Sequence, residues 1–172
     1  MGALLGFDFG PRKIGVAVGQ LVTHSASALT TIRSRRNEPD WGRIEQMVRE
    51  WQPTGAVVGL PFNMDDTEST AAPEARCFAR QLKERCGLEV YFVDERLTSL
   101  EARRQLGRVA TSLEAIDAMA AKLILETWLT DTARQGTDGN QDTDYSVDGG
   151  HSRQEKTTNR ANRCESNLRE FV

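Results

Sequence analysis

The chain has 172 residues, of which 22 are Lys or Arg and 25 are Asp or Glu, for a formal charge of −3 at pH 7. This length suits one domain with a sizeable core and an additional segment. The small net charge excludes a basic surface over the whole protein, so that any contact with nucleic acid must be local. The cysteines and histidines lack the spacing of zinc ligands, and no apolar run approaches the length of a membrane span.

The first third of the chain is typical of strands, because apolar and β-branched residues recur there between turn signals. We expect strands at residues 3–9, 13–19 and about 27–33. The turn "GPRK" is short enough to pair the first two strands in antiparallel fashion. Asp8 lies in the first strand between two phenylalanines, where losing water is costly unless a cation or hydrogen-bond donors replace it.

Helical and strand patterns alternate after residue 40. Asp40 is a typical N-cap, and apolar residues at helical spacing follow it until Pro53. Thr98 and Glu101 have the spacing of a capping box and predict the start of a helix. The remaining elements that we expect are a strand at 55–61, a helix at about 69–86, a strand at 88–95 and a helix at 113–129.

Three strands in a meander, followed by helix, strand, helix, strand and helix, predict an α/β fold of the ribonuclease H-like kind. Its mixed five-stranded sheet would join a three-strand antiparallel meander to two parallel strands, with helices on the flanks. We expect this domain at 1–131. Residues 132–172 are polar, and we expect a disordered tail because such a segment buries too little apolar surface to offset its ordering entropy. The N-terminus lacks the pattern of a signal peptide, which favours a cytoplasmic protein.

Four carboxylates lie at the ends or centres of apolar elements: Asp8, Asp94, Glu95 and Asp117. Gathered in one cleft they would repel one another, and a hard divalent ion such as Mg²⁺ or Mn²⁺ removes that cost. Bound ions of this kind activate water and stabilise the leaving oxygen of a phosphodiester. We predict that Asp8, Glu95 and Asp117 form a catalytic metal site, with Asp94 as the alternative within its pair. Taken singly, Asp94 and Glu95 are also compatible with solvated strand ends and Asp117 with the edge of an apolar helix face, whereas Asp8 in mid-strand between aromatic residues is harder to explain in that way.

Other residues suit the binding of substrate phosphates. Gly10 permits close approach of the backbone, and Lys13 with Arg12 would meet a phosphate, although an ordinary hairpin turn explains the same residues. Asn63 follows a central strand, and Arg96 follows the acidic pair. We predict substrate contacts at Gly10, Lys13, Asn63 and Arg96.

Four stretches are similar to the signature blocks of one known family. In chain order they are "GFDFGPRKIGVAVGQ", "VVGLPFNMDDTES", "FVDERLTSLEA" and "IDAMAAKLILETWL". They resemble the bacterial YqgF family, also called RuvX, and the resemblance covers about residues 3–130. It implies a ribonuclease H-like fold, divalent-metal nuclease activity and a role in maturing the 5′ end of 16S rRNA. The acidic positions of the family match Asp8, the "DE" pair and Asp117.

The resemblance implies nucleic acid as the partner, namely pre-rRNA or a pre-ribosomal particle, for a monomer or homodimer that binds no membrane. Two other functions stay open at this point. One is a Holliday junction resolvase-like DNA nuclease, since a metal site acting on phosphodiesters reads no bases. The other is an RNA-binding ribosome assembly factor without catalysis. An ATP-using kinase of the actin-like superfamily is disfavoured, because the chain has no second Asp-x-Gly strand pair.

Overall fold

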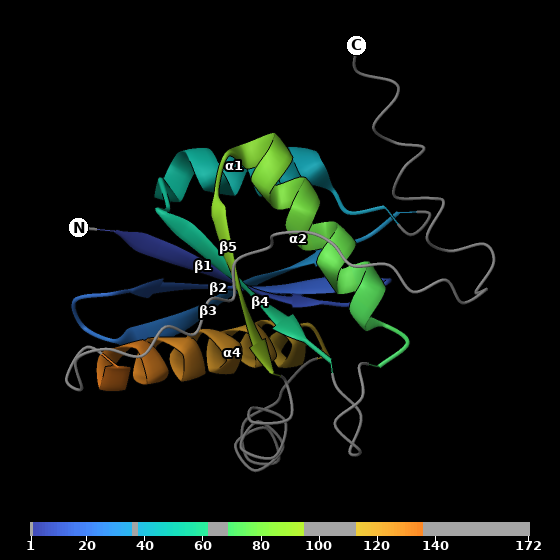
Figure 1. Cartoon of the computed structure of the whole chain (residues 1–172). Coiled ribbons are helices and arrows are strands. Elements are labelled where there is room, and N and C mark those ends of the chain that lie inside the picture. Colours follow the sequence, from blue (N-terminus) through green and yellow to red (C-terminus); the bar gives the residue numbers. More distant parts are fainter. Residues whose placement is uncertain (1, 36–37, 62–68, 95–112, 136–172) are drawn as a thin grey trace, which may run out of the picture.

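A computed structural model describes residues 2–35, 38–61, 69–94 and 113–135. One five-stranded sheet lies between two helical layers in this part of the chain (Figure 1). The elements are β1 (Ala3–Phe9), β2 (Lys13–Gln20), β3 (Ser25–Arg33), α1 (Trp41–Trp51), β4 (Gly55–Leu60), α2 (Ala72–Cys86), β5 (Glu89–Asp94) and α4 (Leu113–Gln135). None of the described helices has the length and apolar character needed to cross a bilayer.

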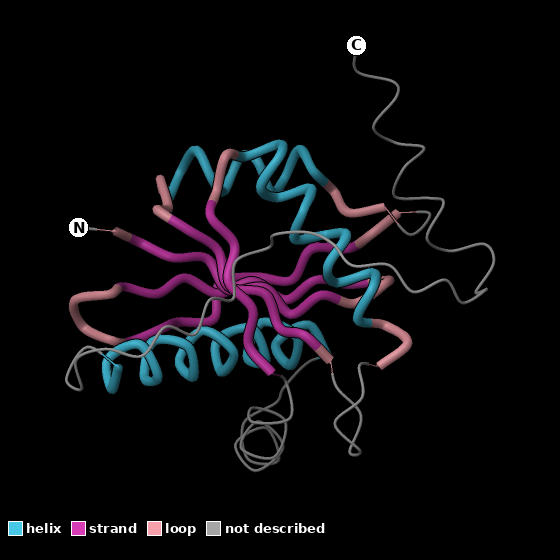
Figure 2. The backbone as a smooth tube through the Cα atoms, in the orientation of Figure 1, coloured by secondary structure: helices cyan, strands magenta, loops and turns pink. Residues whose placement is uncertain are grey.

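The strand order β3-β2-β1-β4-β5 confirms the predicted mixed sheet. The pairs β1–β2 and β2–β3 are antiparallel, whereas β1–β4 and β4–β5 are parallel. Figure 2 shows the strands crossing with a pronounced twist between the helices above and α4 below. Because β1, β4 and β5 run in the same direction, their carboxyl ends lie at one edge of the sheet.

The two faces of the sheet bury different side chains of the same strand. Leu5 and Phe7 of β1 pack in the core beneath α1 and α2, whereas Leu4 belongs to the core beneath α4. All six residues of β4 are buried, as we expected of a central strand covered on both faces. The core is therefore divided by the sheet into two parts, one for each helical layer.

Local signals account for the ends of α1 and α2. Asp40 Oδ1 accepts a hydrogen bond of 3.1 Å from the backbone N–H of Arg43, which confirms the predicted N-cap. Gly87 ends α2 with a φ of 66°, in the left-handed region that glycine adopts readily. Because Ser69 first makes a turn, in which its carbonyl accepts from Ala72 N–H at 2.9 Å, α2 begins at residue 72 instead of the predicted 69.

The last helix is longer than predicted, since α4 continues to Gln135 and passes the expected domain boundary at residue 131. Two threonine hydroxyls in this polar stretch bond to carbonyls one turn earlier in the same helix. Thr130 Oγ1 donates to the carbonyl of Glu126 at 2.8 Å, and Thr132 Oγ1 donates to that of Trp128 at 2.8 Å. Residues 132–135 of the predicted tail at 132–172 are thus helical, and the rest of that segment and the predicted helix after Thr98 lie outside the described residues.

Candidate metal and nucleic-acid site

Asp8 lies on the face of the sheet that α4 covers. A Cβ added at Gly6 would lie 2.9 Å from the carbonyl oxygen of Ala121 in α4, so position 6 points toward that helix. Side chains alternate along a strand, and Asp8 therefore belongs to the same face as Gly6. Its partner in the register of β1 and β2 is Gly15.

Gly15 lets the first turns of α4 come into contact with the sheet. A Cβ at this position would lie within 1.9 Å of the carbonyl oxygen of Asp117, a separation that no side chain tolerates. Paired residues of antiparallel strands have Cα atoms about 4.5–5.5 Å apart, so Asp8 lies beside the point where Asp117 meets β2. Two carboxylates that the sequence places 109 positions apart thus reach one corner of the sheet.

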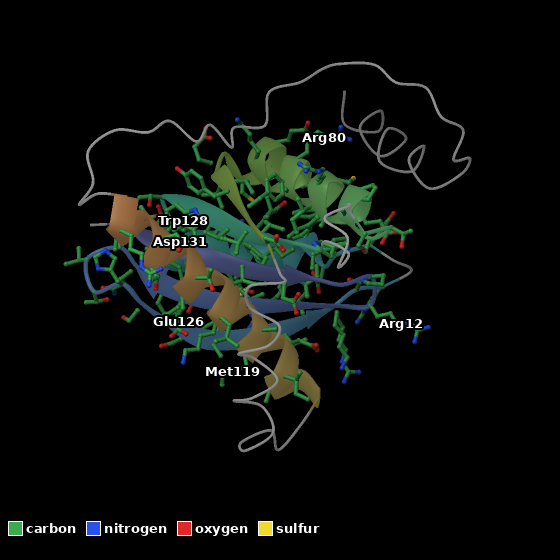
Figure 3. The ribbon with its side chains drawn as sticks, turned by 60° about the horizontal axis from the view of Figure 1, so that its bottom comes forward. Arg12, Arg80, Met119, Glu126, Trp128 and Asp131 are labelled. Carbon is green, nitrogen blue, oxygen red and sulfur yellow. The ribbon has the colours of Figure 1, made fainter. Side chains whose placement is uncertain are left out.

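Lys13 completes this group, because it begins β2 two residues before Gly15 and shares its face. Its Nζ lies 3.7 Å from Asp117 Oδ2, and the two side chains are 34% and 29% exposed. Partly exposed ion pairs of this kind contribute about 0–1 kcal/mol to stability. We call Asp8, Lys13, Gly15 and Asp117 the hairpin corner. In Figure 3 the hairpin, marked by Arg12, and the early turns of α4, marked by Met119, lie at the same end of the molecule.

Asp117 Oδ2 is buried and, within the described residues, has no hydrogen-bond partner. The ammonium of Lys13 is within ion-pairing distance but beyond the range of a direct hydrogen bond. Leaving a buried carboxylate oxygen without donors is costly. Oxygen atoms of this type are the ligands of Mg²⁺ and related hard ions, so the hairpin corner fits a divalent cation.

Asp94 and Asp8 belong to opposite faces of the sheet. Val90 and Phe92 of β5 pack against the core beneath α1 and α2, and Asp94 continues that series as the last residue of the strand. No group of three or more His, Cys, Asp or Glu side chains is placed to hold a metal ion in the part of the chain that the structure describes. Glu95 lies outside that part, so the predicted set of Asp8, Glu95 and Asp117 stays a prediction.

Of the four predicted phosphate contacts, Gly10 and Lys13 belong to the described residues and the other two do not. Gly10 closes the hairpin, since its N–H donates to the carbonyl of Lys13 at 3.0 Å and a Cβ there would lie 2.9 Å from that oxygen. The turn therefore explains this glycine without a ligand. Figure 3 shows Arg12 extending from the same hairpin. Asn63 and Arg96 lie outside the described residues.

Comparison with known proteins identifies the family. The family model described as "RuvX: Holliday junction resolvase" matches residues 2–131, which is most of the chain. The protein belongs to the RuvX family. This confirms the resemblance seen in the four sequence blocks.

Relatives of this RuvX-family protein match over the same region. A protein of Nitrosococcus oceani named "Putative pre-16S rRNA nuclease" is 50% identical over 131 residues, covering 74% of this chain and 86% of its own. A protein of Azotobacter vinelandii with the same name is 48% identical over 132 residues, covering 74% and 93%. Among solved structures, RuvC of Thermus thermophilus is 18% identical with a TM-score of 0.48, covering 78% of this chain and 97% of that one.

Sequence reasoning missed the two contacts that organise the hairpin corner of this RuvX-family protein. It assigned Lys13 to substrate phosphate and did not foresee that the ammonium lies beside Asp117. It also gave no role to Gly15, although an isolated glycine within a strand is a known signal for close approach of another backbone. That signal was present in the run "KIGVAVG".

Proposed function

We propose that this protein is a metal-dependent endonuclease that hydrolyses phosphodiester bonds and processes the 5′ end of pre-16S rRNA in the cytoplasm. The observation that carries the proposal is the buried Oδ2 of Asp117, which has no hydrogen-bond partner among the described residues and lies at the corner that also contains Asp8. The names of the relatives support the substrate, since two proteins that are 50% identical over 131 and 127 residues carry the name "Putative pre-16S rRNA nuclease". Pre-rRNA or a pre-ribosomal particle is then the partner.

Asp8, Asp117 and Glu95 are the residues that would hold the divalent ion, Mg²⁺ or Mn²⁺. Asp94 continues the series that packs beneath α1 and α2, on the face opposite to Asp8, which disfavours Asp94 as the third ligand. When bound, the ion supplies the positive charge that activates the attacking water and stabilises the leaving oxygen.

The chain's own residues provide position and charge. Asp8 is held within β1, and Asp117 is held by the contact of α4 with Gly15, so that both carboxylates are oriented before substrate arrives. Gly10, Lys13, Asn63 and Arg96 are the proposed contacts to the phosphates that flank the cleaved bond. An arginine binds a phosphate through two parallel hydrogen bonds, whereas a lysine acts as a point charge.

The test compares three substitutions of Asp by Asn in the full-length protein. Asp8→Asn and Asp117→Asn each remove a carboxylate at the hairpin corner, and Asp131→Asn removes an exposed carboxylate near the other end of α4 (Figure 3). We expect the first two variants to lose at least about 100-fold in cleavage of an RNA that carries the 5′ precursor of 16S rRNA. The Asp131 variant should cleave like wild type. Undiminished cleavage by folded Asp8→Asn protein would contradict the proposed metal site.

A second candidate substrate is a branched DNA, which the description of the matching family as a Holliday junction resolvase favours. The same protein preparations should be tested on a four-way DNA junction and on the precursor RNA, with equal metal concentrations. Faster cleavage of the junction would favour the DNA substrate. Tight RNA binding with no cleavage of either substrate would favour an assembly factor without catalysis.

A further inference from the structure

Lys13 is the cationic side chain that lies beside the buried oxygen of Asp117. Its Nζ is 3.7 Å from Oδ2, the atom that has no hydrogen-bond partner within the described residues. An ammonium at this distance neutralises much of the carboxylate's charge but donates no hydrogen bond to it. The arrangement therefore lowers repulsion at the corner while leaving the coordination capacity of Oδ2 unused.

We propose that the ammonium of Lys13 stays beside Asp117 Oδ2 only while no metal is bound. A divalent ion that binds this oxygen displaces the ammonium toward the phosphate of the substrate. The inference rests on the proposed function, because it concerns the ion that the hairpin corner would hold. It assigns to Lys13 a role in coupling metal binding to substrate binding.

Electrostatics makes the two cations competitors. A divalent ion and an ammonium that share one carboxylate oxygen repel each other, and the ion has twice the charge. The burial of Oδ2 adds a steric reason, since an ion reaches this atom only if a neighbouring group moves. Of its known neighbours, Lys13 has the long, flexible side chain that is able to do so.

The backbone of Lys13 is well held, so that only its side chain needs to move. Lys13 pairs with Arg33 of β3, and its carbonyl accepts the N–H of Gly10 at 3.0 Å. Its side chain is 34% exposed at the end of the hairpin, where a released ammonium has access to solvent. Binding of the ion should therefore strengthen binding of a phosphodiester, and by linkage the phosphodiester should strengthen binding of the ion.

The first experiment measures Mn²⁺ binding to the full-length protein by calorimetry without nucleic acid. Lys13→Met keeps an apolar stem and removes the competing charge, and we expect it to bind Mn²⁺ at least about threefold more tightly than wild type. Lys122→Met is the matched control, because Lys122 also forms an ion pair on α4, with Glu126 at 3.4 Å. The control makes the same change in net charge and should stay within about twofold of wild type. Equal or weaker binding by Lys13→Met would overturn the inference.

The second experiment follows Lys13 in the wild-type chain and does not depend on the folding of a variant. The protein has four lysines, at positions 13, 83, 122 and 156, and ¹³C-methylation of their amines keeps the positive charge. We expect Mg²⁺ to shift the NMR signal of Lys13 and to leave that of Lys122 in place, with Lys13→Arg providing the assignment. A Lys13 signal that does not move while metal binds would refute the inference alone. A wild-type protein that binds neither Mn²⁺ nor Mg²⁺ would refute the proposed function together with it.

Discussion

Replacing Gly15 with alanine tests whether the contact between α4 and β2 positions Asp117. The new Cβ would lie 1.9 Å from the carbonyl oxygen of Asp117, and Cβ atoms approach other heavy atoms no closer than 3.0 Å. The start of α4 and β2 must therefore move apart by at least about 1.1 Å, the difference between these two distances. The oxygen is a main-chain atom and Cβ is the first atom of the side chain, so no change of rotamer relieves the clash.

Two opposing effects set the change in free energy of unfolding that Gly15→Ala should cause. Overpacking of a core costs about 1–3 kcal/mol, whereas alanine in a strand is about 0.5–1 kcal/mol better than glycine. The net loss in free energy of unfolding should be up to about 2.5 kcal/mol, which lowers the melting temperature by up to about 10 °C in a domain of this size. Because Asp117 moves with the helix, the rate of RNA cleavage should also fall, by up to about 100-fold.

Thermal unfolding by circular dichroism and cleavage of precursor RNA at saturating Mg²⁺ should be measured on the same samples. Gly42→Ala is the control, since a Cβ at that helical position has 3.5 Å to the nearest atom, Asp40 Oδ1, which is ordinary contact. Its melting temperature should be unchanged or slightly higher, because alanine favours helices. If Gly15→Ala melts and cleaves like wild type, the close approach of α4 is not what places Asp117.

Three further predictions concern other parts of the chain. Asp8→Asn should unfold at the wild-type temperature or slightly above it without metal, because the substitution keeps the shape and relieves repulsion with Asp117; a large drop in melting temperature would assign Asp8 to stability instead. Deleting residues 136–172, beyond the end of α4, should leave both the melting temperature and the rate at saturating substrate unchanged, and loss of either would show that this segment is structural. Burial, and next the carboxylate of Glu45, raise the pKa of the Cys86 thiol, so alkylation at neutral pH should be slower than that of an ordinary exposed thiol and should speed up as the pH rises. Peptide mass spectrometry of Cys86 measures this, and rapid labelling at pH 7 would contradict it.

Local sequence patterns determined most of the elements and their faces. The alternation in β1 separates Leu5 and Phe7 from Gly6 and Asp8, and the sheet buries these two sets beneath different helices, as alternation requires. Asp40 and Gly87 act at single helix ends through hydrogen bonds with near neighbours, so their effects are also visible in the sequence. The same local reasoning put Asp8 in a strand and Asp117 on a helix.

The sequence predicted that Asp8 and Asp117 share a site, but only the tertiary structure decided which contacts hold them there. The contact of Gly15 with Asp117, and the ion pair of Asp117 with Lys13, join residues about a hundred positions apart. Such contacts depend on how closely a helix packs on a sheet and at which turn, and neither the period of a helix nor that of a strand contains this information. The sequence therefore indicates which chemical groups are available, whereas the docking of α4 on β1 and β2 determines that two carboxylates and one ammonium share a corner.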